Sequence, residues 1–269
     1  MRSRLVLLVC LLSTAASCQH VKVVPLSHAH AHNDYEHRRP LLDALDNGFC
    51  SIEADIFLVD GELLVAHERD QVRADRSLQS LYLDPLRQRI RANGGRVYRD
   101  GPATITLLID FKTRAAQMYP TLRRVLEHYG EMITTWRDGR VEERAVTIVL
   151  TGDRPPAQVV ALEPIRFAAI DGHIPADLDS DAPASLMPDI SGEWKTLFHW
   201  NGHGTMPETE RIELRRLVER VHAKGRRLRV WGAPDNERVW AELLAAAVDL
   251  INTDDLSGLR NFLTRRDRP

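Results

Sequence analysis

Residues 51–57, Ser51-Ile52-Glu53-Ala54-Asp55-Ile56-Phe57, place two acidic residues in an otherwise apolar run. Side chains repeat every second residue along a strand, so Glu53 and Asp55 are expected on the same face. Near-continuous apolar runs of this kind predict parallel strands that are buried on both faces. The stretch therefore predicts a buried strand that carries a pair of carboxylates.

Similar runs recur along the chain and alternate with amphipathic helical patterns, such as Met118, Leu122 and Leu126 on one helix face. Strands are predicted at residues 21–26, 51–57, 63–66, 104–109, 146–150, 167–170, 228–231 and 250–251. This alternation favours an α/β fold with a parallel sheet. The length suits a single TIM-type (β/α)8 barrel, irregular in places, better than two domains.

Two features of the fold stay open in the sequence. An open doubly wound sheet is the alternative to the barrel, although no glycine-rich phosphate loop follows the first strand. The segment 176–200 is rich in proline and aspartate and has weak periodicity. It is either a long loop over the active-site face or an irregular barrel unit.

The first eighteen residues resemble an export signal, with Arg2 and Arg4 before the apolar run 5–12. That run is shorter than the roughly 20 residues of a membrane-spanning helix. The following Ala-Ala-Ser-Cys resembles a bacterial lipobox, in which Cys18 is lipidated, and ordinary secretion is the alternative. We therefore predict a signal peptide at 1–18, one domain at 19–269, and an exported protein that is periplasmic or anchored as a lipoprotein.

Composition excludes two further classes of protein. The net charge of −2, with both signs interspersed, gives no sign of nucleic-acid binding. The three cysteines allow at most a Cys18–Cys50 bridge in the mature chain, so this is not a disulfide scaffold. We expect a monomer that contacts a membrane only through a lipid anchor.

Polar side chains cluster where the predicted strands end, and the carboxyl ends of barrel strands converge on one face. These residues are His28, His30, His32, Glu53, Asp55, His67, Asp110 and Lys112. Three carboxylates suit a hard cation such as Mg²⁺ or Ca²⁺. Two histidines suit a general base and a general acid, and a lysine suits a phosphate oxygen. The pattern predicts phosphoryl transfer.

The stretch His30-Ala31-His32-Asn33-Asp34-Tyr35, then Glu53-Ala54-Asp55 and finally 61–68 with His67, resembles a known superfamily. It is the superfamily of glycerophosphodiester phosphodiesterases and phosphatidylinositol-specific phospholipases C, and the nearest branch is the one named for altered inheritance of mitochondria. The resemblance is strong over residues 28–112 and thinner afterwards. It implies a TIM-barrel phosphoric diester hydrolase that acts on a glycerophosphodiester or a (lyso)phospholipid-type substrate.

The resemblance also implies roles for individual residues. Glu53, Asp55 and Asp110 would hold one divalent cation, Mg²⁺ or Ca²⁺. His32 would be the base and His67 the acid, with His30 the alternative to His32. The residues implied to bind substrate are His30, Asn33, Lys112 and Trp231. The usual His-Arg-Gly is His-Asn-Asp here, and a Pro-Glu-Asn-Thr motif is missing, which leaves the identity of the diester open.

Two other functions compete with this interpretation. The His30-x-His32 pair also opens amidohydrolase and histidinol-phosphatase-type barrels, which bind transition metals. Residues available to complete such a site are His173, His199, His203 and Asp254. The second alternative is a non-catalytic surface lipoprotein that binds a lipid headgroup. Trp194, Trp200 and Trp231 either form an aromatic pocket for it or pack in the core.

Overall fold

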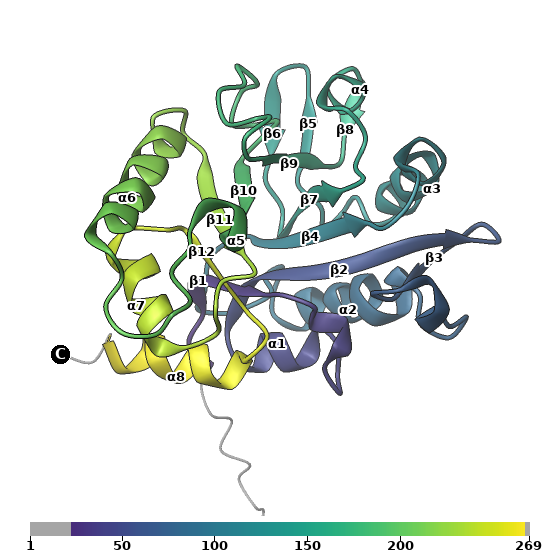
Figure 1. The fold of residues 1–269 in the computed structure, drawn as a ribbon. Helices are drawn as coiled ribbons and strands as arrows, with labels where there is room; N and C mark the ends of the chain where they lie inside the picture. Colours follow the sequence, from purple (N-terminus) through teal and green to yellow (C-terminus); the bar gives the residue numbers. More distant parts are fainter. Residues whose placement is uncertain (1–22, 267–269) are drawn as a thin grey trace, which may run out of the picture.

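Parallel strands form a closed barrel in the computed structural model, which describes residues 23–266 (Figure 1). The barrel strands are β1 (Leu26–Ala31), β2 (Phe49–Val59), β4 (Ile105–Phe111), β7 (Val146–Gly152), β9 (Ala169–His173), β10 (Asp189–Glu193), β11 (Arg227–Trp231) and β12 (Leu250–Thr253). Each pairs with its neighbours in parallel, and β1 pairs with both β12 and β2, which closes the ring. The predicted TIM-type fold is confirmed, and the open sheet is excluded.

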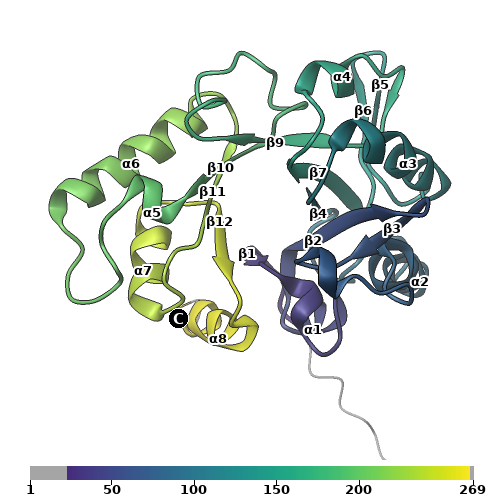
Figure 2. The ribbon, with the colours of Figure 1, turned by 45° about the vertical axis from the view of Figure 1, so that its right-hand side comes forward.

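Helices surround this barrel on its outside (Figure 2). They are α1 (Leu42–Asp46), α2 (Asp84–Ala92), α3 (Ala115–His128), α4 (Ala157–Ala161), α5 (Trp194–Leu197), α6 (Glu208–His222), α7 (Glu237–Ala245) and α8 (Leu256–Arg266), with short helical turns η1 (Asp34–Glu36), η2 (Arg69–Gln71) and η3 (Gln79–Leu83). The outward side chains Ala54, Leu107 and Ile109 are fully buried in the apolar core. The main core therefore lies between strands and helices.

Irregular elements interrupt the strand–helix repeat. Strand β3 (Glu62–Val65) pairs with β2 in the antiparallel direction. A separate small sheet is formed by β5 (Thr135–Arg137), β6 (Arg140–Glu142) and β8 (Ile165–Arg166). The open question about 176–200 is resolved as an irregular barrel unit, because this segment contains β10 and the short helix α5. No helix lies between β9 and β10 in the described chain.

The first strand lies five residues later than predicted, at Leu26–Ala31 instead of 21–26. His28 and His30 are therefore part of the strand rather than of the loop after it, and His32 directly follows the strand. Ala29 and Ala31 are fully buried, and so is His30, which points into a polar barrel interior. Sequence periodicity missed this register because a strand with alternating His and Ala lacks the expected apolar pattern.

The turn after β1 is held by a buried acid. Asp34 is fully buried and accepts hydrogen bonds from the Leu41 backbone N–H and the Tyr82 hydroxyl. Its other carboxylate oxygen has no hydrogen-bond partner among the described residues. Burial raises the pKa of Asp34 from 3.8 to about 6, against the lowering effect of these two donors.

This raised pKa predicts that the free energy of unfolding depends on pH, and that Asp34→Asn removes this dependence. Folded Asp34 keeps its proton to higher pH than unfolded Asp34, so stability is lost as pH rises from about 4 through about 6. At about 1.4 kcal/mol per pH unit, the loss approaches about 3 kcal/mol. Urea unfolding of both proteins between these pH values should show the wild-type advantage shrinking as pH rises. A difference that is independent of pH contradicts this role.

Candidate active site

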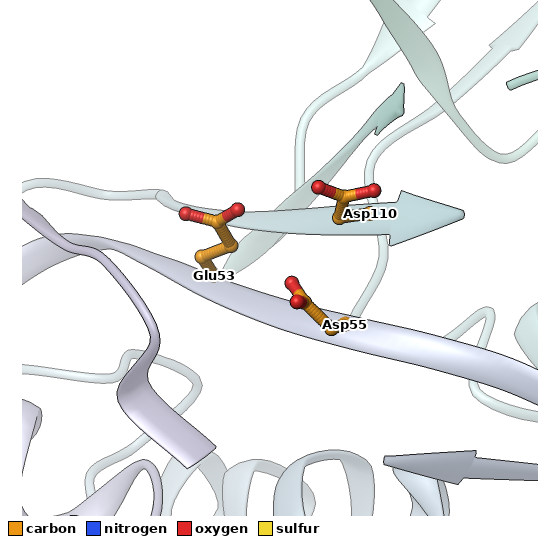
Figure 3. Close-up of side chains that lie close together, drawn as sticks. All are labelled: Glu53, Asp55 and Asp110. Atoms are coloured by element: carbon orange, nitrogen blue, oxygen red, sulfur yellow. The ribbon is translucent and has the colours of Figure 1, made fainter. Parts of the chain in front are cut away.

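Three carboxylates meet at the carboxyl ends of two neighbouring strands. Glu53 and Asp55 lie on β2, and Asp110 lies beside Asp55 in register on β4. Each offers an oxygen within 4.8 Å of the others. Figure 3 shows the three side chains close together, Glu53 and Asp55 on one strand and Asp110 on its neighbour. Glu53 and Asp55 are buried, and Asp110 is partly exposed. The predicted i, i+2 spacing of Glu53 and Asp55, together with the register of β4 against β2, thus places all three side chains inside the barrel mouth.

The three carboxylates of this cluster carry more negative charge than the neighbouring cations neutralise. Lys112 Nζ lies 2.7 Å from Asp55 Oδ2 and 3.3 Å from Asp110 Oδ2. Burial, together with the charge of Glu53, raises the pKa of Asp55 to about 7 and also raises that of Asp110. Asp55 Oδ1 is buried with no hydrogen-bond partner in the described chain. Hard oxygen donors with an unused oxygen and too little positive charge fit a divalent cation.

His32 stands at the end of β1 with its ring held by a carboxylate. Its Nδ1 lies 2.8 Å from Asp254 Oδ1, in the loop after β12. Burial alone would lower the pKa of His32, but the hydrogen bond to Asp254 and the negative charges of Glu53 and Asp254 together outweigh it and raise the pKa. Because the carboxylate accepts the Nδ1 proton, the Nε2 atom of neutral His32 is left with a free lone pair.

His67 follows β3 and is held in a similar way. Its Nδ1 lies 2.9 Å from the Tyr35 hydroxyl and 3.2 Å from Asp55 Oδ2. The Tyr35 and His67 rings are stacked with a 16° angle between their planes. The side chain of His67 is 42% exposed. A ring fixed through Nδ1 and open to solvent can exchange a proton through Nε2.

Both histidines line a pocket of about 430 Å³ at the barrel mouth. It is lined by His32, Asn33, Glu53, His67, Asp110, Lys112, Thr151, Gly152, His173, Ile174, Ser191, Gly192, Glu193, Thr196, Arg229 and Trp231. Seven residues of the predicted site are among them, and Asp55 lies next to the pocket lining as part of the carboxylate cluster with Glu53 and Asp110. The structure thus gathers most of the predicted residues at one place.

His30 does not reach this pocket, although the sequence predicted that it binds substrate. It is fully buried, with Nδ1 2.7 Å from Ser51 Oγ and Nε2 3.3 Å from Glu53 Oε2. Burial lowers its pKa to about 4. Neutral His30 therefore supports Glu53 from inside the barrel, and His32, directly after β1, is the histidine that faces the pocket.

Arg229 is a buried site residue that the sequence analysis missed. Its guanidinium lies 3.5 Å from Glu53 Oε2 and 3.6 Å from Asp171 Oδ2. It donates to Ser191 Oγ at 2.9 Å and to Asn252 Oδ1 at 3.2 Å. Burial would raise the pKa of Glu53, but the His30 hydrogen bond and the Arg229 charge hold it well below its usual range. A charged residue inside the apolar run 228–231 was the available signal.

The aromatic residues separate into two roles. Trp231 ends β11, is 37% exposed and lines the pocket. Trp194 and Trp200 are buried, and the Trp194 ring packs against Trp200 and Phe198. Core packing therefore describes Trp194 and Trp200, and only Trp231 is open to a ligand.

The histidines that an amidohydrolase-type metal site would need do not come together in the structure. Within residues 23–266, the one trio of side chains close enough to hold a metal is Glu53, Asp55 and Asp110, which contains no histidine. His199 and His203 are exposed on the loop before α6, and neither lines the pocket. The amidohydrolase-type site is therefore disfavoured.

The closed barrel, with acidic strand ends and two histidines at one mouth, defines a barrel enzyme of the phosphodiesterase class. Comparison with known families agrees: the AIM6-like phosphodiesterase domain matches residues 19–171, more than half of the chain. The chain belongs to this family, and it is a phosphodiesterase. The predicted resemblance is confirmed, and the non-catalytic alternative is set aside.

Individual relatives agree with this assignment. Altered inheritance of mitochondria protein 6 of Eremothecium gossypii is 28% identical, over 88% of this chain and 69% of the relative. Its counterpart in Saccharomyces cerevisiae is 25% identical, over 84% of this chain and 68% of the relative. The crystal structure of a glycerophosphodiester phosphodiesterase from Parabacteroides distasonis has the same fold, with a TM-score of 0.53 and 13% identity, over 91% of this chain and 100% of that one.

The predicted location is wrong. We predicted a periplasmic protein or a membrane-anchored bacterial lipoprotein, whereas these relatives are fungal, hence eukaryotic, and are not bacterial lipoproteins. The predicted signal peptide and Cys18 lie in residues 1–22, outside the described part of the chain. Within residues 23–266, no helix has the length and apolar character needed to cross a bilayer.

Proposed function

We propose that this phosphodiesterase uses one divalent cation, held by Glu53, Asp55 and Asp110, together with His32 as general base and His67 as general acid. One observation carries the proposal: each histidine has its Nδ1 engaged by a polar group, while both line the pocket beside the carboxylate cluster. This is the arrangement that two-step proton transfer requires.

The residues would divide the reaction as follows. A bound Mg²⁺ or Ca²⁺ would neutralise the phosphate charge and polarise the phosphorus–oxygen bonds. His32 Nε2 takes the proton of the attacking water or substrate hydroxyl as its oxygen bonds to phosphorus. His67 Nε2 gives a proton to the departing alcohol oxygen. Lys112, which is partly exposed and lines the pocket, binds a phosphate oxygen as a point charge.

The proposed substrate is a glycerophosphodiester or a (lyso)phospholipid-type diester. The pocket of about 430 Å³ accommodates a small headgroup beside the phosphate. Trp231 and Asn33 both line this pocket, where Trp231 would supply an apolar face for the headgroup and Asn33 would bind the phosphate. The Parabacteroides distasonis protein with the same fold is a glycerophosphodiester phosphodiesterase, which supports the glycerophosphodiester proposal.

Trp231→Ala is expected to weaken substrate binding without destabilising the fold. Loss of an aromatic contact worth about 1–2 kcal/mol corresponds to a five- to thirtyfold rise in KM. Trp194→Ala is the matched control, because that ring is buried and its loss should cost about 3–5 kcal/mol of stability. An unchanged KM with a lowered melting temperature in Trp231→Ala contradicts the substrate role.

A product assay tests the proposed function. The chain is stripped of metal, Mg²⁺, Ca²⁺, Mn²⁺ or Zn²⁺ is added singly, and release of glycerol phosphate, choline or nitrophenol is followed across a panel of diesters. Activity with Mg²⁺ or Ca²⁺ is expected, and the preferred product names the substrate. Activity that needs no metal, or needs Zn²⁺ alone, contradicts the proposal.

A further inference from the structure

Two polar side chains after β1, those of Asn33 and Tyr35, have no role in the proton transfers proposed above. Asn33 precedes the turn η1 and has left-handed backbone angles, with φ 46° and ψ 34°. Tyr35 lies within η1 and is 3% exposed. Few residues other than glycine tolerate the left-handed region, and asparagine is one of them. These residues replace the Arg and the residue after Gly in a His-Arg-Gly pattern.

Together they join the two histidines by one polar network. The Asn33 amide nitrogen lies 3.0 Å from His32 Nδ1 and donates to Asp254 Oδ1 at 3.4 Å. Asn33 Oδ1 accepts from the Tyr35 hydroxyl at 2.7 Å, and the same hydroxyl lies 2.9 Å from His67 Nδ1. Because Asp254 Oδ1 also accepts from His32 Nδ1, the network runs from His32, through Asp254, Asn33 and Tyr35, to His67.

The number of protons available in this network determines which groups donate hydrogen bonds and which accept them. The Tyr35 hydroxyl has one proton for two acceptors, Asn33 Oδ1 at 2.7 Å and Asp55 Oδ2 at 2.6 Å. Its oxygen can then accept only from His67, so His67 Nδ1 carries a hydrogen. Asp254 likewise accepts from His32 Nδ1. Both rings are thereby held with hydrogen on Nδ1, and Nε2 of each is left for proton transfer.

The surrounding structure makes this turn rigid. Arg76 donates to the backbone oxygen of Tyr35, and buried Asp34 between the two residues accepts from Leu41 and Tyr82. A hydroxyl held on three sides selects one ring orientation of His67 and one tautomer. A phenylalanine at 35 would keep the packing and lose that selection.

We propose that Tyr35 is a positioning residue that fixes His67 for acid catalysis, and that Asn33 couples this unit to His32. The inference rests on the proposed function, in which His67 protonates the leaving group. Neither side chain donates a proton to the reacting atoms. Their effect passes through the imidazoles, so it depends on how much help the leaving group needs.

The test compares Tyr35→Phe on two diesters that differ only in the leaving alcohol. For an alkyl alcohol, which needs protonation to depart, kcat is expected to fall about 10- to 100-fold with KM unchanged. For a nitrophenol, which departs without protonation, kcat is expected to change by less than about threefold. Tyr98→Phe is the matched control, because its buried hydroxyl bonds, among residues 23–266, only to the backbone of Leu45 and Phe49.

Each other result decides against a stated claim. If Tyr35→Phe lowers kcat equally on both diesters and also weakens cation binding measured by calorimetry, then Tyr35 positions Asp55 rather than His67. That result would overturn the inference. Unchanged kcat on the alkyl diester also overturns it. If His67→Ala keeps full activity on the alkyl diester, the proposed function itself fails, whatever Tyr35→Phe does.

Asn33→Gly tests the coupling to His32, since glycine retains the left-handed backbone and removes the amide. Both leaving groups require the base, so kcat should fall about tenfold on both diesters. The double variant with Tyr35→Phe should lose less than the product of the single losses on the alkyl diester. Full additivity there means two independent contacts and overturns the coupling.

Discussion

His67→Ala should lower kcat on an alkyl diester by about two to four orders of magnitude, the range by which a general acid accelerates such a step. The leaving alcohol would then have to depart as an alkoxide, because the structure offers no other histidine beside Asp55 in the described chain. His67 is 42% exposed, so the fold should keep its melting temperature. Steady-state kinetics and thermal unfolding on the same preparation measure both effects.

His199→Ala is the matched control for this loss. It removes an exposed histidine outside the pocket, and it should leave kcat unchanged. If His199→Ala were as damaging as His67→Ala, a histidine-rich metal centre would have to be reconsidered. A fall of less than about tenfold in His67→Ala would deny that residue its role as the acid.

Arg229→Met should cause the largest loss of stability, about 3–5 kcal/mol, because it removes the cation from a buried ion network. The carboxylates of Glu53 and Asp171 would keep their burial without their counter-charge. Burial already raises the pKa of Asp171. Methionine has a similar length and replaces five N–H donors with none, so the effect measures the lost charge and hydrogen bonds.

Chemical denaturation at pH 7 measures this loss, and Arg215→Met on α6 is its control. Arg215 pairs with Glu208 at the surface, where such pairs contribute about 0–1 kcal/mol. The control should therefore remain close to wild type. Equal stabilities for Arg229→Met and Arg215→Met would mean that the barrel interior is solvated and that Arg229 is dispensable to the fold.

The carboxylate cluster was predictable because strand geometry is local. Glu53 and Asp55 are two residues apart on β2, and Asp110 is the next-to-last residue of the neighbouring strand β4. An i, i+2 repeat fixes the face of each side chain, and barrel topology brings the strand ends together. The sequence therefore predicted the acidic half of the site from two short motifs.

The other half depends on pairings that local patterns do not encode. Asp254 and Arg229 reach the site from β12 and β11, at sequence separations above 170 residues from their partners His32 and Glu53. Strand β10, Asp-Ile-Ser-Gly-Glu, was not predicted because its inward residues are polar and match no apolar repeat. The polar barrel interior is the physical reason that β10 was missed, and the long sequence separation is the reason that the contacts of Asp254 and Arg229 were missed.

Calorimetric titration of the metal-free chain with Mg²⁺ or Ca²⁺, followed by a diester assay at each occupancy, tests the central claim most directly. We expect one cation per chain, activity that rises with its binding, and at least about tenfold weaker binding in Asp110→Asn. Full activity of the metal-free chain, or zinc bound at two sites with no effect of Asp110→Asn, would contradict it.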